Sequence, residues 1–153
     1  MNDQLSDLAT RLETAQKRLM DSLEAATDRE LYTTPAEGEW TVAQVCAHVA
    51  ELQPLWMGKI AAMDRESKVA RTEADVEARG AALRDHASDT LATIVERLDD
   101  ANSRALERLR EVTVSDLERR SSSDKTATEL IESHVIDHVE AHARQIAETR
   151  GVV

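Results

Sequence analysis

The stretch WTVAQVCAHVAELQPLWMGKIAAM, residues 40–63, decides the fold class of this chain. Its apolar residues return at three- and four-residue steps, the spacing that gathers side chains on one face of an α-helix. They are Val42, Val45, Val49, Leu52, Trp56, Ile60 and Met63. Thr41 followed by Gln44 is the pattern of a capping box at a helix start, and Pro54 predicts a kink or an earlier helix end. The stretch therefore predicts a long amphipathic helix.

Three further stretches carry the same apolar spacing and predict helices over residues 3–27, 88–112 and 126–149. Thr126 followed by Glu129 repeats the capping pattern at the start of the last one. Four amphipathic helices of about six turns bury their apolar faces most simply against one another. We therefore expect one all-α domain, a four-helix bundle that spans residues 1–153.

The connections between these helices differ in length and character. Residues 31–39 contain a Thr-Thr-Pro sequence and a glycine, which predicts a loop, and residues 113–125 form a polar connection rich in serine. Residues 64–87 are charged and predict a crossover connection that contains a short helix. Because this connection is long, the four helices need not follow a simple up-down-up-down order.

The composition excludes several classes of protein. With 4 Gly, 2 Pro and no Phe among 153 residues, the chain lacks the turn residues that many short strands require. A net charge of −11 disfavours binding to nucleic acid or to an anionic membrane. No stretch approaches the ~20 apolar residues that span a bilayer, the first residues do not resemble a signal peptide, and Cys46 is a lone cysteine. We expect a cytoplasmic protein without disulfides. Cys46 is expected to be a small core residue, and Trp56 to pack in the core or, alternatively, at a subunit contact.

The chemical interest of the sequence lies in its histidines. His134, His138 and His142 follow one another at four-residue spacing, which places them on successive turns of one helix. His138 and His142 flank the apolar side of that helix, where burial favours the neutral imidazole that a metal requires. His48, on another helix, is the candidate third ligand. Three imidazoles with an open fourth position are typical of catalytic metal sites; the alternative is a set of histidines satisfied by ordinary hydrogen bonds.

The other residues near the predicted site can be interpreted as functional or as purely structural. Glu51, three residues after His48, is the candidate catalytic residue, as a general base or a partner of metal-bound water; the alternative is a solvated carboxylate. We expect His134 to be a core or supporting residue and not a fourth ligand, and His86 to lie at the surface. Gln145 is placed to orient an imidazole, although glutamines are common on helix surfaces.

Two segments carry a resemblance to a known family. The stretch PAEGEWTVAQVCAHVAE, residues 35–51, and the stretch HVIDHVEAHARQI, residues 134–146, resemble the DinB-like, or YfiT-like, superfamily. The resemblance implies a four-helix bundle with crossed connections of the up-down-down-up type, often dimeric. It also implies a divalent metal site whose three histidine ligands fall on His48, His138 and His142.

The resemblance also suggests a reaction class. Several members of that superfamily are transferases or isomerases that use a small thiol such as bacillithiol or mycothiol. We therefore expect a metal-dependent enzyme acting on a small molecule, in first place a thiol-dependent S-transferase, working as a homodimer. The alternatives are a metal-dependent hydrolase and a non-catalytic metal-binding or dimerisation bundle. Zn, Ni, Fe and Mn all accept imidazole ligands, and we expect Zn or Ni first.

Overall fold

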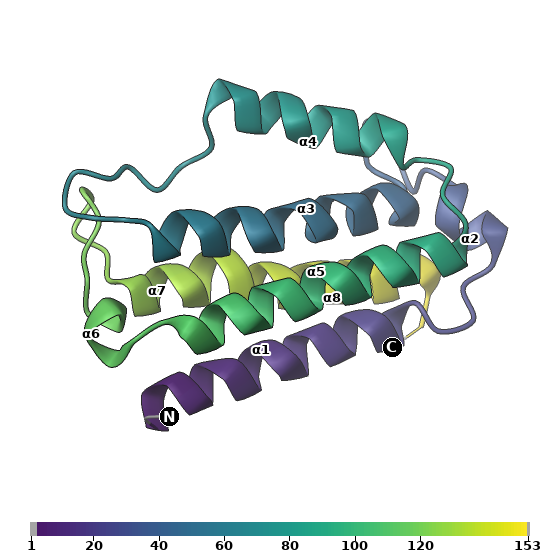
Figure 1. The fold of residues 1–153 in the computed structure, drawn as a ribbon. Helices are drawn as coiled ribbons and strands as arrows, with labels where there is room; N and C mark the ends of the chain where they lie inside the picture. The colour runs from purple at the N-terminus through teal and green to yellow at the C-terminus, as the bar shows by residue number, and fades with distance from the viewer. Residues whose placement is uncertain (1–2, 153) are drawn as a thin grey trace.

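The computed structural model describes residues 3–152, which form a bundle of four long helices with a further helix packed on its outside (Figure 1). The helices are α1 (Asp3–Ser22), α2 (Asp28–Tyr32), α3 (Val42–Ala61), α4 (Glu73–Asp85), α5 (Leu91–Glu111), α6 (Val114–Leu117), α7 (Ala127–Ile131), the π-helical segment η1 (Glu132–Ile136) and α8 (Asp137–Arg150). Between residues 3 and 152, β-pairing is limited to an isolated bridge of Arg120 with Thr126. The predicted all-α four-helix bundle is confirmed.

The four long rods of the bundle are α1, α3, α5 and the continuous rod α7–η1–α8. Side-chain contacts show their directions. Gln4 near the start of α1 bonds Thr128 near the start of the last rod, and Arg150 at the end of that rod bonds the Ser22 backbone at the end of α1. Along α5 the order is reversed, since Glu13 pairs with Arg110 whereas the later Gln16 bonds the earlier Asn102. The last rod is therefore parallel to α1, and α5 is antiparallel to it. The colours of Figure 1 show α3 running in the same direction as α5, so α4 has to return the chain along the bundle.

The helix starts follow the threonine signals of the sequence. Thr41 accepts a hydrogen bond from the Gln44 backbone N–H while the Gln44 side chain reaches back to Thr41, and Thr126 and Glu129 form the same capping box at α7. Both predicted caps are confirmed. The crossover helix α4 begins with a further box, formed by Thr72 with Asp75.

One local prediction was wrong, at the end of the first helix, and one of two alternatives at Pro54 is excluded. The helix predicted over residues 3–27 ends at Ser22, because Ala25 takes a left-handed conformation with φ of 56° and a capping box at Thr27 starts α2 inside the predicted loop. The second helix continues through Pro54, so it does not end before the proline, and the kink stays a prediction. A proline inside a helix costs about 3 kcal/mol, and the complete burial of Leu52 and Met57 on either side of it offsets that cost.

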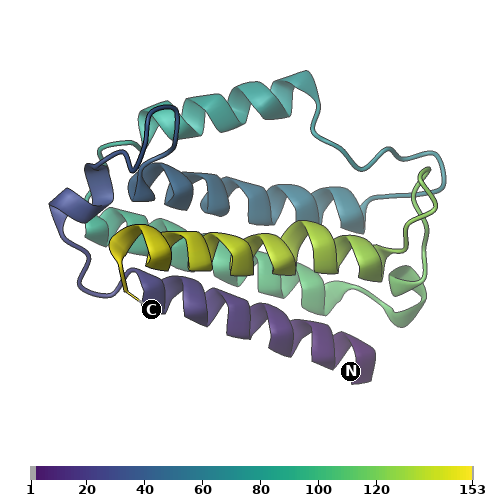
Figure 2. The same cartoon turned by 180° about the vertical axis from the view of Figure 1, so that it is seen from behind.

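The last rod contains a π-helical turn, which the sequence pattern did not predict. Residues 132–136 take this wider turn between α7 and α8. A π turn holds an additional residue within the helix, so it changes which residues share a face before and after it. His134 lies within the turn, whereas His138 and His142 lie in the regular helix that follows. Seen from behind, this rod lies between α1 and α3 (Figure 2).

The hydrophobic core is built by the four long rods and excludes α4. Each rod contributes fully buried side chains, such as Leu12, Leu52, Leu98 and Val139. By contrast, α4 has no buried residue and packs on α3, where Lys59 and Asp75 form an ion pair of 2.9 Å. No helix between residues 3 and 152 combines the length and apolar character that crossing a membrane requires.

Candidate metal centre

Three predicted ligands lie together between α3 and α8. The imidazole ring centroids of His48 and His142 are 5.1 Å apart with the rings nearly perpendicular, at 89°. Those of His138 and His142 are 6.0 Å apart, with 56° between their planes. The fold therefore brings an imidazole from the second rod to two imidazoles from the last rod. Their metal-binding role stays a prediction.

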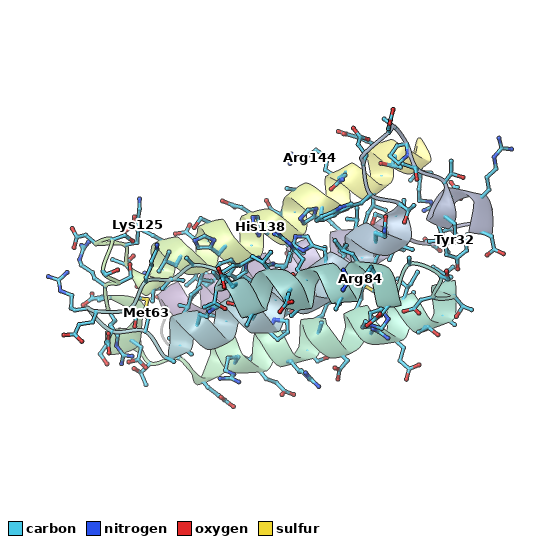
Figure 3. All side chains as sticks on the ribbon, turned by 90° about the horizontal axis from the view of Figure 1, so that it is seen from above. Tyr32, Met63, Arg84, Lys125, His138 and Arg144 are labelled. Carbon is cyan, nitrogen blue, oxygen red and sulfur yellow. The ribbon has the colours of Figure 1, made fainter. Side chains whose placement is uncertain are left out.

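The two helices run in opposite directions, which is why these residues can meet. His48 lies two turns from the start of α3 and is 6% exposed. His142 lies in the second half of the continuous last rod α7–η1–α8, one turn after His138, and both are partly exposed. Figure 3 views the molecule from above and labels His138 on the last rod, near the middle of the bundle. The cluster is thus half-buried and open on the α8 side.

Hydrogen bonds determine which ring nitrogen carries the proton in His48 and in His142. His48 Nδ1 lies 3.1 Å from Glu51 Oε1, and His142 Nδ1 lies 2.9 Å from Gln145 Oε1. Both partners are oxygen acceptors, so each Nδ1 carries the proton and donates it. In a neutral imidazole the other nitrogen, Nε2, then holds a lone pair. A metal ligand has this form, with an oxygen acceptor behind it to orient the ring.

The Glu51 carboxylate accepts hydrogen bonds from two residues. Besides His48, it accepts hydrogen bonds from Arg71 at 2.6 Å and 3.2 Å. Burial raises the pKa of the Glu51 carboxyl, but the hydrogen bonds from His48 and Arg71 outweigh it and leave the pKa below its usual value. The carboxylate is therefore an ionised acceptor that orients His48. Its predicted role as a general base stays a prediction, and this geometry supports the orienting role instead.

His138 is the ring without a protein partner at its buried nitrogen. Its Nδ1 is enclosed and makes no hydrogen bond. Burial lowers the pKa of His138, and the neighbouring positive charges of His142, His134, His48 and Arg71 lower it further. Burial also lowers the pKa of His142, against a raising contribution from its hydrogen bond to Gln145. Both rings are therefore neutral near pH 7, as metal ligands must be.

The spacing of the rings bears on whether they can share one metal ion. Two imidazoles bound tetrahedrally to one zinc ion, with bonds of about 2.0–2.1 Å, have ring centroids roughly 5 Å apart. The His48–His142 separation agrees with this value, and the His138–His142 separation is somewhat larger. In the described chain, no three His, Cys, Asp or Glu side chains are already gathered tightly enough to enclose an ion. The residues fit a metal, and the third bond requires His138 to move toward the other two.

Aromatic contacts support the cluster from both ends. The Trp40 ring meets the His48 ring with centroids 5.1 Å apart, and His134 stacks on Trp56 at 4.6 Å with 24° between the planes. The guanidinium carbon of Arg71 lies 5.6 Å from the centre of the Trp56 ring. His134 therefore packs against Trp56, in keeping with the supporting role predicted for it.

Two other residues considered from the sequence lie outside the cluster. His86 ends α4 and is hydrogen-bonded to Asp89 at 2.9 Å and to Arg97, so it belongs to the junction of α4 with α5. Cys46 is 2% exposed, and burial raises the pKa of its thiol to about 12. A buried thiol of this kind stays protonated at neutral pH and is inert. The prediction of Cys46 as a core residue is confirmed.

Sequence reasoning missed the contributions of Arg71 and of Trp56 beside it. Arg71 precedes the threonine that caps α4, inside a charged connection, and nothing in its sequence context separates it from a solvated arginine. Trp56 was read as ordinary core packing. Their contacts with Glu51 and His134 depend on how the crossover lies over α3, which periodicity does not reveal.

Two hollows border the cluster. One, of about 420 Å³, is lined in part by Trp40 and Gln145, the residues that touch His48 and His142. The other, of about 550 Å³, runs along α4 and has Arg71 in its wall. Each hollow thus reaches a residue that contacts the cluster, while none of the three histidines lines either hollow.

Comparisons with known proteins agree with this architecture. YfiT from Bacillus subtilis, described as a probable metal-dependent hydrolase with an unusual four-helix bundle topology, has a similar structure, with a TM-score of 0.70 and 20% identity. The match covers 100% of this chain and 91% of that chain, and at this identity it shows a shared fold. No curated protein matches the sequence. The model of the DinB superfamily matches residues 11–146, most of the chain, and the protein therefore belongs to the DinB superfamily.

Proposed function

We propose that this protein is a metal-dependent enzyme that acts on a small molecule, with one divalent transition metal held by His48, His138 and His142. The observation that carries the proposal is the meeting of three imidazoles from two helices, one buried and two half-buried, with the enclosed Nδ1 of His138 free of protein partners. The partial exposure of His138 and His142 favours a site that substrate can reach. A closed structural site would have no such access.

The residues of the chain have distinct tasks in this proposal. Glu51 and Gln145 accept hydrogen bonds from Nδ1 of His48 and His142, which leaves the lone pair on each Nε2 for the metal. His138 contributes its unpartnered nitrogen. A bound divalent metal, with Zn or Ni expected first, supplies a Lewis acid that keeps a thiol ionised near pH 7 or lowers the pKa of water.

The reaction we propose first is transfer of a low-molecular-weight thiol to a carbon electrophile. The new bond joins sulfur to carbon, a leaving group such as halide departs with the bonding electrons, and the thiol proton passes to solvent. This choice is supported by the family resemblance. Metal-dependent hydrolysis is the second candidate, supported by the description of YfiT.

We also propose that the protein is a homodimer. Light scattering of the purified protein measures its molar mass and so tests this.

The first test is metal content. Protein purified without added metal, or reconstituted with Zn²⁺ or Ni²⁺, should contain about one metal ion per chain by elemental analysis. His48→Ala, His138→Ala and His142→Ala should each lose metal affinity by more than the roughly 10–100-fold that loss of an outer hydrogen-bond partner costs. His86→Ala is the matched control, because His86 pairs with Asp89 and Arg97 away from the cluster. An equal loss in all four variants, or no metal in the wild type, contradicts the assignment.

The second test separates the reactions. The metal-loaded protein is assayed with bacillithiol, mycothiol, glutathione or cysteine against 1-chloro-2,4-dinitrobenzene, and in parallel with ester and amide substrates without thiol. Metal-dependent thioether formation supports the transferase. Metal-dependent hydrolysis without thiol supports the hydrolase instead. Silence in every assay, with metal bound, leaves a non-catalytic metal-binding bundle as the better description and overturns the enzyme proposal.

A further inference from the structure

The crossover that carries α4 reaches the candidate metal centre through one side chain. Arg71 lies in the connection between α3 and α4, with its side chain 12% exposed, and it contacts both Glu51 and Trp56. We propose that Arg71 is a positioning residue that couples the docking of this crossover to the orientation of His48. The inference rests on the proposed function, since it concerns the same centre.

The first step of the argument is the chain of hydrogen bonds from Arg71 to His48. Two guanidinium nitrogens of Arg71 donate to the two oxygens of Glu51, at 2.6 Å and 3.2 Å. Such a two-point contact holds the carboxylate plane in one orientation. One of these oxygens also accepts from His48 Nδ1 at 3.1 Å. The orientation of the His48 ring therefore depends on Glu51, and that of Glu51 depends on Arg71.

The second step is the contact of Arg71 with the other side of the centre. Its guanidinium lies near the face of Trp56, and Trp56 stacks on His134, four residues before His138. A cation over an indole face is attracted by the ring electrons. Arg71 thus touches one group that supports the ring from α3 and one group that packs against the last rod.

The third step is the weak attachment of the crossover itself. Since α4 buries no residue, its position on α3 depends on half-buried contacts, notably the ion pairs Lys59–Asp75 and Arg71–Glu51. Only the second of these two pairs reaches a histidine of the cluster. Energetic coupling between two sites is reciprocal. Metal binding should therefore hold the crossover more firmly, and a docked crossover should raise metal affinity, through Arg71 and not through Lys59.

The experiment compares Arg71→Ala and Arg71→Lys with the matched control Lys59→Ala. Competition with a chelator measures Zn²⁺ affinity, which should fall roughly 10–100-fold in Arg71→Ala, as for loss of other outer partners. Arg71→Lys should recover little, because lysine lacks the planar fork of two donors. Lys59→Ala removes the other ion pair between the crossover and α3, Lys59–Asp75, and should leave the affinity unchanged.

A second readout does not need metal. In metal-free protein at pH 7.5, nitrogen NMR of His48 should show the proton on Nδ1 in the wild type and in Lys59→Ala, and a mixture of tautomers in Arg71→Ala. Hydrogen exchange of residues 62–90 should slow on adding Zn²⁺ in the wild type and not in Arg71→Ala.

The outcomes separate the two proposals. If the wild type binds no metal, the proposed function fails, while the tautomer of His48 still tests the role of Arg71. If Arg71→Ala and Lys59→Ala behave alike in the affinity and tautomer measurements, the positioning role of Arg71 is wrong. Far-UV circular dichroism of each variant identifies a loss of folding. If Arg71→Ala does not fold, the tautomer of His48 in Arg71→Lys and Arg71→Gln tests the positioning role instead.

Discussion

At the scale of single residues, the candidate centre depends on the partner that stands behind each imidazole. Glu51 and Gln145 each accept an Nδ1 proton, and each lies three residues after the histidine that it orients. This spacing on a helix puts the acceptor one turn along the same face. The same three-residue offset occurs in α3 and in α8, so two helices prepare their histidines in the same way.

A pH dependence follows from the buried histidines. Burial is the largest cause that lowers the pKa of His134, His138 and His142 below the ordinary value of 6.5. In the window from about pH 6.5 down to these lowered values, the unfolded chain binds more protons than the folded one, so stability falls as pH falls. We expect the urea midpoint of metal-free protein to be highest above pH 6.5 and to decrease between pH 6.5 and 5.5.

The contribution of the histidines to this pH dependence of stability can be distinguished from that of the carboxylates. Glu51 and Glu129 have pKa values below their usual 4.5, so the stability that they contribute is lost only below that range. The decrease between pH 6.5 and 5.5 should become smaller in His138→Gln. A midpoint that is constant, or that rises as the pH is lowered through this window, contradicts the histidine assignment.

At the scale of elements, the π-helical turn of the last rod is the feature with the clearest consequence. It occupies residues 132–136 and joins α7 to α8. Because it accommodates an additional residue, it lets Leu130 and Ile131 before it and Val139 and Ile146 after it all face the core. It also directs His134 to Trp56.

A deletion tests this reading of the π turn. Removal of Ser133, an exposed residue within η1, should convert the segment to a regular α-helix while both flanking segments keep their buried faces. The protein should stay folded, with a loss of at most about 2 kcal/mol in the free energy of unfolding. Urea unfolding followed by circular dichroism measures this, and metal binding by His138 and His142 should persist.

The control deletes Arg144, an exposed residue of the regular helix α8 (Figure 3). There the helix holds no additional residue, so the deletion turns Ile146, which is fully buried, by about 100° away from the core. We expect the Arg144 deletion to be much less stable than the Ser133 deletion. If the two deletions lower the free energy of unfolding equally, η1 does not compensate for the removal of Ser133.

At the scale of the whole molecule, a buried polar network joins three of the four rods. The side chain of Gln53, which is fully buried, donates to Asn102 Oδ1 at 2.8 Å and accepts from Gln16 at 2.9 Å. The Gln16 amide also donates to the Asn102 backbone oxygen at 3.0 Å. These bonds connect α1, α3 and α5 near their centres. Sliding any of these rods along its neighbours would leave buried polar groups unpaired, so the network specifies their register.

Replacement of Gln53 tests the network. Gln53→Met keeps most of the volume but leaves Gln16 and Asn102 without their buried partner, which should cost roughly 1–3 kcal/mol in the free energy of unfolding. Urea denaturation at pH 7.5 measures the change. Gln4→Met is the control, because the exposed Gln4 bonds Thr128 at the surface; it should stay within about 0.5 kcal/mol of the wild type. A Gln53→Met protein as stable as this control contradicts the assigned role.

Much of the architecture could be read from local patterns. Three- and four-residue apolar steps predicted all four rods, and threonines with a partner three residues on predicted the starts at Thr41 and Thr126. The sequence was less decisive at places where local signals conflict. At Pro54 a helix breaker lies within a strongly buried face, and burial prevails. Near Thr27 a second cap follows closely on the end of the first helix, and a separate short helix forms.

The sequence by itself determined the fold class and nominated His48, His138 and His142, because helix periodicity and four-residue histidine spacing are local properties of the chain. The tertiary structure alone decided that the rings of His48 and His142 lie 5.1 Å apart, that a π turn sends His134 to Trp56, and that Arg71 holds Glu51. These contacts join residues distant along the chain, or depend on the winding of a single turn. Their geometry is set by the packing of α3 against the last rod and the crossover, and no periodicity in the sequence encodes it.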